Sequence, residues 1–594
     1  MQRPRGGHAT AGGNWARRRY RQGMKSPYER RPKDAVGKVF TVRTSGTVFL
    51  FGPELEILDT PEFQRLAGIK QLGTSYFVFR GAVHTRFEHA LGAVHTAQKI
   101  IESVNRNPYA KRTIMPREMR LARLFALLHD VPHVPFGHTL EDEFGLLTRH
   151  DKNAARIDKL LWNSRIGAIL EEAIEPDELV TLKAMIAADG DAEIAKLGLD
   201  AFLVDIVANT VCADAIDYIQ RDLEACGMPV ELGDRFLDFF VVTGDDVPAS
   251  ENRNRMALAL EKRGMPRPDV ESEVVKLLSY RYELAERVYF HHAKNAASVM
   301  IGRAVQALGL DARDENFHEL SDDVLLAILR RPAIADALDL DVHADADREL
   351  AAELGTLLDS RRLFKIAYLG VADDFGYRIS DVYSRYGRNP AARTELENRL
   401  ADMAGVSAGQ VLVHLPPEKM AEKLANVRVQ TTDGVVIRLQ EWDDQHTKRV
   451  SALNAAHRRL WRVAVYVHPD LPAAERRLVK AAAEAIFGVP SRYVPDDGPT
   501  GYLEELFDLV AAAEEWTLDD RQALVGQPLA ADAYATRAEA EALIRGLVEA
   551  RRATGEQVTP APAPVPAEAA NTQQQDGTGE QRLPGMSDSG AGGD

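Results

Sequence analysis

The segment MRLARLFALLHD (residues 119–130) constrains the fold of this chain more than any other stretch. Leu121, Leu124 and Leu128 recur at helical spacing, so the segment predicts a helix with one buried face. The helix ends in the adjacent pair His129–Asp130, and further histidines follow at His133 and His138. A buried helix end with hydrogen-bonded histidines is one interpretation of this pattern. A metal site is the other, and the rest of the sequence has to decide between them.

The pattern elsewhere in the chain is mostly helical. Residues 200–226 and 275–308 each carry apolar side chains at helical spacing, and each predicts a long helical stretch. Strand-like alternation is confined to short segments at 38–51, 411–415, 434–439 and 461–468. Strands and helices do not alternate as a doubly wound sheet requires. The sequence therefore predicts a mainly α fold, a helical core with small β elements and a C-terminal α+β region.

Composition divides the chain into four parts. Residues 1–35 are rich in Gly and Arg and poor in apolar residues, so we expect a disordered basic arm. The core would span 36–310, and a packing and assembly region would span 311–551, opened by a helix whose N-cap is Ser321. Residues 552–594 are dominated by Pro, Ala, Gln, Gly and Ser, which predicts a disordered tail.

The charge and cysteine content exclude several classes of protein. A formal net charge of −16 argues against a nucleic-acid binder that uses its whole surface, although the basic arm could touch nucleic acid. No apolar run reaches the length of a membrane span, and the N-terminus lacks a signal-peptide pattern. The only cysteines, Cys212 and Cys226, fit a reducing compartment. We therefore expect a cytoplasmic protein that is not bound to a membrane.

Four residues in sequence order supply a set of metal ligands: His89, His129, Asp130 and Asp214. Two imidazoles and two carboxylates suit a divalent ion such as Fe, Mn, Zn or Co and leave positions open for water and substrate. Each residue alone is more often a hydrogen-bonded core residue. The order H…HD…D on predicted helices favours the metal site.

Phosphate chemistry needs a cation and a proton donor beside such an ion. Arg86 precedes His89 by three residues, so both would share a helix face, and its guanidinium could hold a phosphate. His138 and His150 could act as general acid or base. Glu141 and Asp151 could orient these imidazoles. Because a bound divalent ion makes water a nucleophile near neutral pH, the set predicts hydrolysis of a phosphoester or phosphoanhydride.

Three segments in this order, LDTPEFQRLAGIKQLGTSYFVFRGAVHTRFEHALG, LLHDVPHVPFGH and DAIDYIQRD, resemble the HD-domain deoxynucleoside triphosphate triphosphohydrolases. The likeness runs from about Lys38 to Met300 and continues more weakly to about residue 369. It implies an HD-domain helical core and hydrolysis of dNTPs to a deoxynucleoside and inorganic triphosphate. It also implies Mg²⁺ on the substrate triphosphate in addition to the ion of the His/His/Asp/Asp site.

The resemblance implies a role for each matching residue. The metal ligands are the four named above, and the catalytic residues are His138, His133, His150, Arg86 and Glu141. The residues that bind the substrate are Gln71, Leu72, Arg86, Tyr218, Asp222, Arg281 and Tyr289. The residues that match a nucleotide effector site between subunits are Lys38, Asp59, Gln64 and Arg65.

Several positions depart from the family pattern. Pro132 stands where the HD motif has glycine, and Glu141 replaces an aspartate. Ala215 replaces a lysine that contacts phosphate, so the grip on the triphosphate is expected to rest on Arg281 and Lys294. Ala67 and Gly68 replace an arginine and an aromatic residue of the effector site. Activation by an effector is therefore a hypothesis here.

Two other classes of function stay open at this point. One is a different phosphohydrolase on the same scaffold: a phosphodiesterase, a nucleotidase or a single-strand nuclease. The other is a non-catalytic nucleotide sensor. The resemblance further implies a homo-oligomer, a tetramer or hexamer, and a role in dNTP-pool control or phage defence.

Overall fold

The computed structural model describes most of the chain between residues 37 and 554. The described residues are 37–107, 110, 112–244, 247, 252–262, 264–310, 316–417, 427–431, 434–493, 506–507, 510–511, 516 and 537–554. The expected basic arm 1–35 lies outside them. So does the expected tail 552–594, apart from residues 552–554, which are the last turn of a helix.

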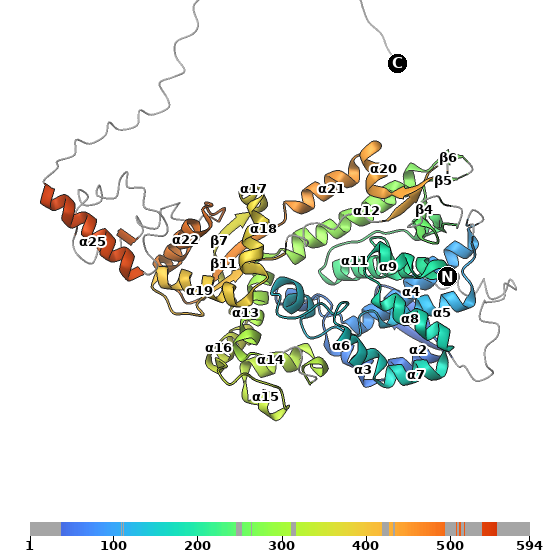
Figure 1. Cartoon of the computed structure of the whole chain (residues 1–594), viewed down its shortest axis with the longest axis horizontal. Helices are drawn as coiled ribbons and strands as arrows, with labels where there is room; N and C mark the ends of the chain where they lie inside the picture. Colours follow the sequence, from blue (N-terminus) through green and yellow to red (C-terminus); the bar gives the residue numbers. More distant parts are fainter. Residues whose placement is uncertain are drawn as a thin grey trace, which may run out of the picture.

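Helices dominate the described residues, as the sequence predicts (Figure 1). Those up to residue 308 are α2 (Pro53–Leu58), α3 (Pro61–Gln64), α4 (Arg86–Arg106), α5 (Pro116–Leu128), α6 (Ala154–Ile157), α7 (Arg165–Ala173), α8 (Pro176–Ala187), α9 (Asp191–Ala195), α10 (Ala201–Val207), α11 (Ala213–Ala225), α12 (Pro268–Leu284) and α13 (His292–Leu308). Those after it are α14 (Asp322–Arg330), α15 (Ala333–Ala337), α16 (Arg348–Asp359), α17 (Ala372–Phe375), α18 (Arg378–Val382), α19 (Pro390–Ala404), α20 (Leu439–Gln445), α21 (Arg449–Arg458), α22 (Ala473–Phe487) and α25 (Arg537–Thr554). Short turns used below are the 3₁₀ turns η1 (Arg65–Gly68) and η2 (Gly73–Phe77) and the π-helical turns η3 (Thr139–Glu143) and η8 (Ala285–Tyr289).

The strands form small sheets. Two are hairpins, β1 (Lys38–Val42) with β2 (Gly46–Leu50) and β5 (Glu261–Lys262) with β6 (Met265–Pro266). The third, in strand order, is β10 (Val436–Arg438), β9 (Arg428–Gln430), β4 (Met256–Ala259) and β3 (Phe240–Val242). The fourth is β7 (Lys365–Val371), β11 (Arg462–Val467) and β8 (Val411–His414). All four segments predicted to be strand-like contain a strand, and the mainly α fold class is confirmed.

Two predicted helical stretches are interrupted in the structure. Residues 200–226 break at 208–212 between α10 and α11, where the Cys212 thiol accepts a hydrogen bond from the backbone N–H of Ala215. Residues 275–308 break near Phe290, between the π-helical turn η8 and α13. Apolar periodicity continues through both breaks because both flanking helices bury a face. Apolar periodicity alone therefore does not locate the ends of these helices.

Helix α4 lies at the centre of the N-terminal part and packs between α5 and α11. Its first turn is closed by Glu88, whose carboxylate accepts from the backbone N–H of Thr85. Gly92 lets α11 approach closely, because a Cβ there would lie 2.0 Å from the Asp217 carboxylate. This packing brings the start of α4, the end of α5 and the start of α11 to one place.

Hydrophobic contacts continue across residue 310. One cluster of buried side chains joins Phe136 and Leu140, beyond α5, to Leu308, Leu325 and Tyr466. Strand β4 also pairs in parallel with β9, which follows it by more than 160 residues. In Figure 1 the helices α4 to α8 gather at one end of the molecule, and the β7–β11–β8 sheet with α19 and α22 lies at the other. Among the described helices, none has the length and apolar character needed to cross a membrane.

Candidate metal centre and histidine pocket

The four predicted metal ligands come together where α4, α5 and α11 meet. His89 lies in the first turns of α4, His129 and Asp130 follow α5 directly, and Asp214 lies in the first turn of α11. The Oδ1 atom of Asp214 is 3.0 Å from His89 Nε2 and 3.7 Å from His129 Nε2. Asp130 adds its carboxylate, with Oδ2 3.8 Å from His89 Nε2 and Oδ1 3.6 Å from His129 Nε2.

The chemistry of these atoms fits a divalent cation. The Nε2 atoms of His89 and His129 are buried and make no well-formed hydrogen bond among the described residues. Their other ring nitrogens are occupied: His89 Nδ1 lies 2.9 Å from Asp217, and His129 Nδ1 lies 2.8 Å from the Ala126 carbonyl. Such outer partners fix the ring so that Nε2 is presented to an ion. Two orphaned imidazole nitrogens facing two carboxylates are the donor set of a transition-metal site.

The electrostatics of the cluster also favour a cation. Burial lowers the pKa of His89, but the nearby carboxylates of Asp214 and Asp217 outweigh burial and raise it to about 10. Burial raises the pKa of Asp214, but the two histidines outweigh this and hold it well below its usual value. The carboxylates thus create a negative potential that draws positive charge to this point.

Arg86 connects this cluster to the neighbouring histidines. It is the first residue of α4, and its Nη1 donates to Asp130 Oδ2 at 2.7 Å. The other oxygen of Asp130 lies 3.2 Å from His133 Nε2. Arg86 is buried beside Asp130, and its Nε atom has no hydrogen-bond partner among the described residues.

The three predicted catalytic histidines form one pocket. The rings of His133 and His150 stack with centroids 3.4 Å apart, and the His138 ring meets their edges at 5.0 and 5.8 Å. Burial and the charges of Arg86 and His150 hold the pKa of His133 well below its usual range. His138 is the most exposed of the three, with about half of its side chain accessible.

The partners of these histidines differ in part from the prediction. Glu141 orients His150 as expected, with 3.1 Å between Oε2 and Nδ1. Asp151 does not orient an imidazole, because its carboxylate pairs with Arg149. Asp142 takes that role for His138 at 2.9 Å. The four-residue spacing from His138 to Asp142 was the available signal.

A buried arginine supports the same pocket and was missed. Arg156 Nη1 donates to Glu141 Oε1 at 2.8 Å. Burial raises the pKa of Glu141, but its hydrogen bond to His150 and the nearby cations outweigh this and lower it to about 2. The sequence carried no signal for Arg156, which lies 15 residues beyond Glu141 in a different helix.

The predicted substrate residues line a region next to the metal cluster. Tyr289 donates to Asp222 Oδ2 at 3.4 Å, and His84, which the sequence did not indicate, lies 2.7 Å from Asp222 Oδ1. Tyr218 is on the same helix as Asp222, and burial raises its pKa to about 12, whereas the charge of Arg281 lowers it. Among the described residues the buried Oε1 of Gln71 has no hydrogen-bond partner. Leu72 follows it and is buried.

The amine of Lys294 is buried and forms an ion pair with Glu143. Glu143 belongs to the turn η3, which follows His138. The grip on the triphosphate expected from Arg281 and Lys294 stays a prediction.

The four residues that match an effector site fall into two groups. Lys38, Asp59 and Gln64 are exposed, and the Gln64 amide donates to the Leu58 carbonyl at 2.8 Å. Arg65 donates to the carbonyls of Val131 and His133 at 2.6 and 2.7 Å. Burial lowers the pKa of Arg65 to about 10. Arg65 therefore supports the loop after Asp130, and its role in an effector site stays a prediction.

The comparisons with known proteins agree with this geometry. Residues 86–221 match the HD domain, and residues 274–496 match the HD associated region. The chain therefore contains an HD domain and an HD associated region, and the resemblance seen in the sequence is confirmed at that level.

The similarity to individual relatives is low and covers only part of the chain. The deoxynucleoside triphosphate triphosphohydrolase SAMHD1 of Gallus gallus is 27% identical over 57% of this chain and 59% of its own length. SAMHD1 of Xenopus laevis is 32% identical over 34% of this chain and 37% of its own length. An uncharacterized protein of Methanocaldococcus jannaschii is 29% identical over 48% of this chain and 53% of its own length. The chain thus spans about half the length of the curated relatives it matches.

A solved structure supports the fold. The crystal structure of a hypothetical protein from Aquifex aeolicus aligns with a TM-score of 0.51 and 22% identity. The alignment covers 74% of this chain and 99% of that one. At this identity the likeness concerns the fold alone.

Proposed function

We propose that this protein is a metal-dependent hydrolase that converts dNTPs to a deoxynucleoside and inorganic triphosphate. The observation that carries the proposal is the position of Arg86 and Asp130, which join a metal-ligand cluster to a pocket of three histidines. The activity for which the SAMHD1 relatives are named supports the choice of substrate.

In this proposal the chain's own residues position the phosphate and move the proton. A divalent ion held by the four ligands would polarise a phosphate oxygen and supply a nucleophile from water. Arg86 would donate its unpaired Nε to the α-phosphate. The attacking water releases one proton to solvent and its oxygen bonds to the α-phosphorus, the bond to O5′ breaks, and His138 donates a proton to O5′. Asp142 would hold His138 Nδ1 so that the other nitrogen faces the leaving group.

The residues around Asp222 support the proposal that the bound group is a deoxynucleoside. The buried Gln71 Oε1 has no hydrogen-bond partner among the described residues, so it can accept a hydrogen bond from a sugar hydroxyl. Leu72, the next residue after Gln71, has an apolar side chain, which disfavours a sugar that carries a further hydroxyl. Asp222, Tyr289 and Arg281 would hold the remainder of the nucleotide.

The biological setting belongs to the same proposal. A homo-oligomer, control by a nucleotide effector, a cytoplasmic location and a role in dNTP-pool control or phage defence rest on the family resemblance. Lys38 and Asp59 are exposed and so are accessible to an effector or to another subunit.

The test is hydrolysis of each dNTP and each rNTP by the purified chain with Mg²⁺ or Mn²⁺, with products separated by chromatography. Asp214→Asn should abolish activity because the metal loses a charged ligand. Asp336→Asn is the matched control, since Asp336 pairs with Arg348 on the surface. We expect nucleoside and intact triphosphate from dNTPs only, with wild-type rates in the control.

Other results would contradict the proposed dNTP substrate or cleavage position but would still support a phosphohydrolase. Release of diphosphate or monophosphate would place bond cleavage elsewhere on the triphosphate. Metal-dependent cleavage of an oligonucleotide or a nucleoside monophosphate, with dNTPs untouched alone and in mixtures, would favour another HD-domain phosphohydrolase.

A further inference from the structure

Three consecutive acidic residues of the π-helical turn η3 reach different partners. Glu141 and Asp142 each orient a histidine of the pocket. Glu143, the last residue of the turn, instead forms a buried ion pair with Lys294 of α13. Turns of this kind are frequent at functional sites. Neither the metal ligands nor the proton transfer described above uses this pair.

The pair is enclosed by residues from the C-terminal part of the chain. Only 6% of Glu143 and 4% of Lys294 is exposed. His414 of β8 lies near the second carboxylate oxygen, with 3.9 Å between Nε2 and Oε2 of Glu143. Burial and the charge of Lys294 hold the pKa of His414 well below its usual range. The imidazole is therefore neutral, and Lys294 is the cation that balances Glu143.

The residue after the turn is held by the same part of the chain. The buried guanidinium of Arg393 in α19 donates to the Phe144 carbonyl at 3.1 Å and lies 4.2 Å from the centroid of the Phe144 ring. Gly302 of α13 lets this ring approach, because a Cβ there would lie 2.4 Å from it. The end of η3 therefore contacts α13, α19 and β8, all within the HD associated region.

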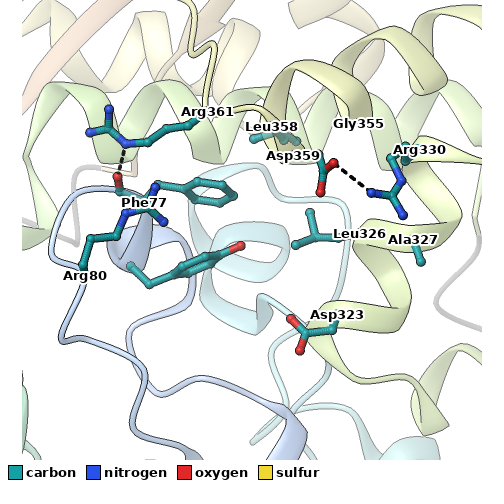
Figure 2. A pocket seen from close by; sticks show the side chains of 11 residues that line it. Phe77, Arg80, Asp323, Leu326, Ala327, Arg330, Gly355, Leu358, Asp359 and Arg361 are labelled. Carbon is teal, nitrogen blue, oxygen red and sulfur yellow. Dashed lines mark hydrogen bonds and ion pairs between the residues drawn. The ribbon is translucent and has the colours of Figure 1, made fainter.

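Apolar packing in the surrounding hydrophobic cluster is incomplete. Phe77 of η2 belongs to the same cluster as Phe144. A cavity of about 350 Å³ lies beside Phe77, between η2 and the helices α14 and α16. Figure 2 shows that Phe77, Leu326 and Leu358 extend into it. Because apolar contacts fix a position only where packing is close, they leave a need for a more directional contact at the turn.

The energetics of the pair indicate a role in geometry. The desolvation of two charges can exceed their attraction, and an apolar pair of similar volume often stabilises a fold equally well. An ion pair has a preferred direction that an apolar contact lacks. The pair of Glu143 and Lys294 applies that direction to the residue next to Asp142.

We propose that Glu143 and Lys294 are positioning residues for His138. Their ion pair fixes the end of η3, where the adjacent Asp142 holds His138 Nδ1 at 2.9 Å. The inference rests on the proton donation by His138 in the proposed function, and it adds the residues that set the place of the donor. Lys294 then acts on the turn and not on the triphosphate.

Steady-state hydrolysis by metal-loaded full-length variants tests the proposal. Lys294→Met and Glu143→Gln each break the pair. The double variant Glu143→Gln/Lys294→Met removes both charges, so that no unpaired buried charge can unfold the chain. Lys294→Arg keeps a cation at this place. Lys480→Met is the matched control, because Lys480 is an equally buried lysine that pairs with Glu484 of α22 at 3.5 Å.

We expect kcat to fall at least about ten-fold in the single and double variants, since general-acid catalysis contributes roughly 100- to 10,000-fold. The KM and the amount of bound metal should not change. Lys294→Arg should recover part of the lost kcat, and Lys480→Met should have the kcat of the wild type. Hydrogen exchange followed by mass spectrometry should show faster exchange in residues 139–147 of the variants that lack the pair.

Several results would overturn the proposal. A higher KM with an unchanged kcat would assign Lys294 to the triphosphate. An unchanged kcat in the double variant, or an equal loss in Lys480→Met, would show that the pair does not position His138. Unchanged exchange in residues 139–147 would show that the pair does not hold the turn, and this measurement needs no substrate. If the wild type cleaves no dNTP, the proposed substrate fails, and kcat is compared on the oligonucleotide or nucleoside monophosphate that it cleaves.

Discussion

At the scale of single residues, the metal centre depends on residues that do not themselves face the ion. Asp217 lies 2.9 Å from His89 Nδ1 and is held in turn by Arg221 and Ser45. Burial raises the pKa of Asp217, but Arg221 and His89 outweigh it and lower it to about 2. The carboxylate therefore stays charged and keeps the His89 proton on Nδ1, which presents Nε2 to a metal.

Asp217→Asn tests this role. We expect metal affinity to fall by roughly 10- to 100-fold, as for other outer partners of metal-bound histidines. Competition with a chromophoric chelator measures it, and circular dichroism should show a retained fold. Asp336→Asn, the surface control, should leave the affinity unchanged. Wild-type metal affinity in Asp217→Asn would show that His89 is oriented without this carboxylate.

At the scale of elements, Asp322 joins the start of α14 to two loops of the N-terminal part. Its side chain is fully buried, and both of its hydrogen-bond donors are backbone N–H groups. The sequence predicted that Ser321 caps this helix, but the Ser321 side chain makes no capping hydrogen bond. Asp322 uses its carboxylate to bind other elements instead.

Asp322→Ala should lower the free energy of unfolding by about 2–5 kcal/mol, because two buried N–H groups lose their acceptors. Urea denaturation followed by circular dichroism measures it. Asp323→Ala is the control, and we expect a change of less than about 1 kcal/mol because its pair with Lys70 is exposed at Asp323. Equal effects from the two variants would contradict the role given to Asp322.

Glu397 of α19 gives the fold a pH dependence. It is buried, its Oε1 accepts from the backbone N–H of Val413 at 2.9 Å, and burial raises its pKa from 4.5 to about 7. Between these values the native state binds more protons than the unfolded chain. Its contribution is therefore complete below about pH 4.5 and is lost as the pH rises through 7.

Glu397→Gln keeps the acceptor and removes the ionisation. Between pH 5 and 8 we expect the variant to gain stability relative to the wild type by roughly 3 kcal/mol, from the size of the pKa shift. Chemical denaturation at several pH values measures the difference. Parallel pH profiles for the two proteins would show that Glu397 does not ionise in this window.

At the scale of the whole molecule, the two parts expected on either side of residue 310 share a hydrophobic cluster. Phe136 and Leu140 pack in it with Leu308, Leu325 and Leu358. The cluster includes the loop that carries His133 and His138. The histidine pocket therefore rests on residues from both parts of the chain.

A chain that ends at residue 310 should not fold cooperatively, because part of this cluster would be exposed to water. A chain that ends at residue 554 keeps every described element and should unfold as the full chain does. Calorimetry and gel filtration compare the two. A cooperative transition in the shorter chain would show that the N-terminal part folds alone.

The sequence by itself determined the mainly helical class and four segments that contain strands, and it predicted a set of metal ligands. Strands β3, β4, β5, β6, β7 and β9 lie outside those segments. The predictions follow from local periodicity and from the side-chain chemistry of His and Asp, both of which are carried by the residues themselves. The order of His89, His129, Asp130 and Asp214 predicted a metal site from side-chain chemistry, and the packing of α4 against α5 and α11 brings the four residues together.

The tertiary structure alone decided which residues support that site. Asp217 reaches His89 across 128 residues, Arg156 reaches Glu141 from another helix, and Arg65 turns inward to the loop after Asp130. Such contacts depend on where helices end and on the angle at which they pack. The breaks near residues 210 and 290 change where helices end and begin, and apolar periodicity does not detect them. The cavity beside Phe77 is formed by elements almost 300 residues apart, so only the packed chain reveals it.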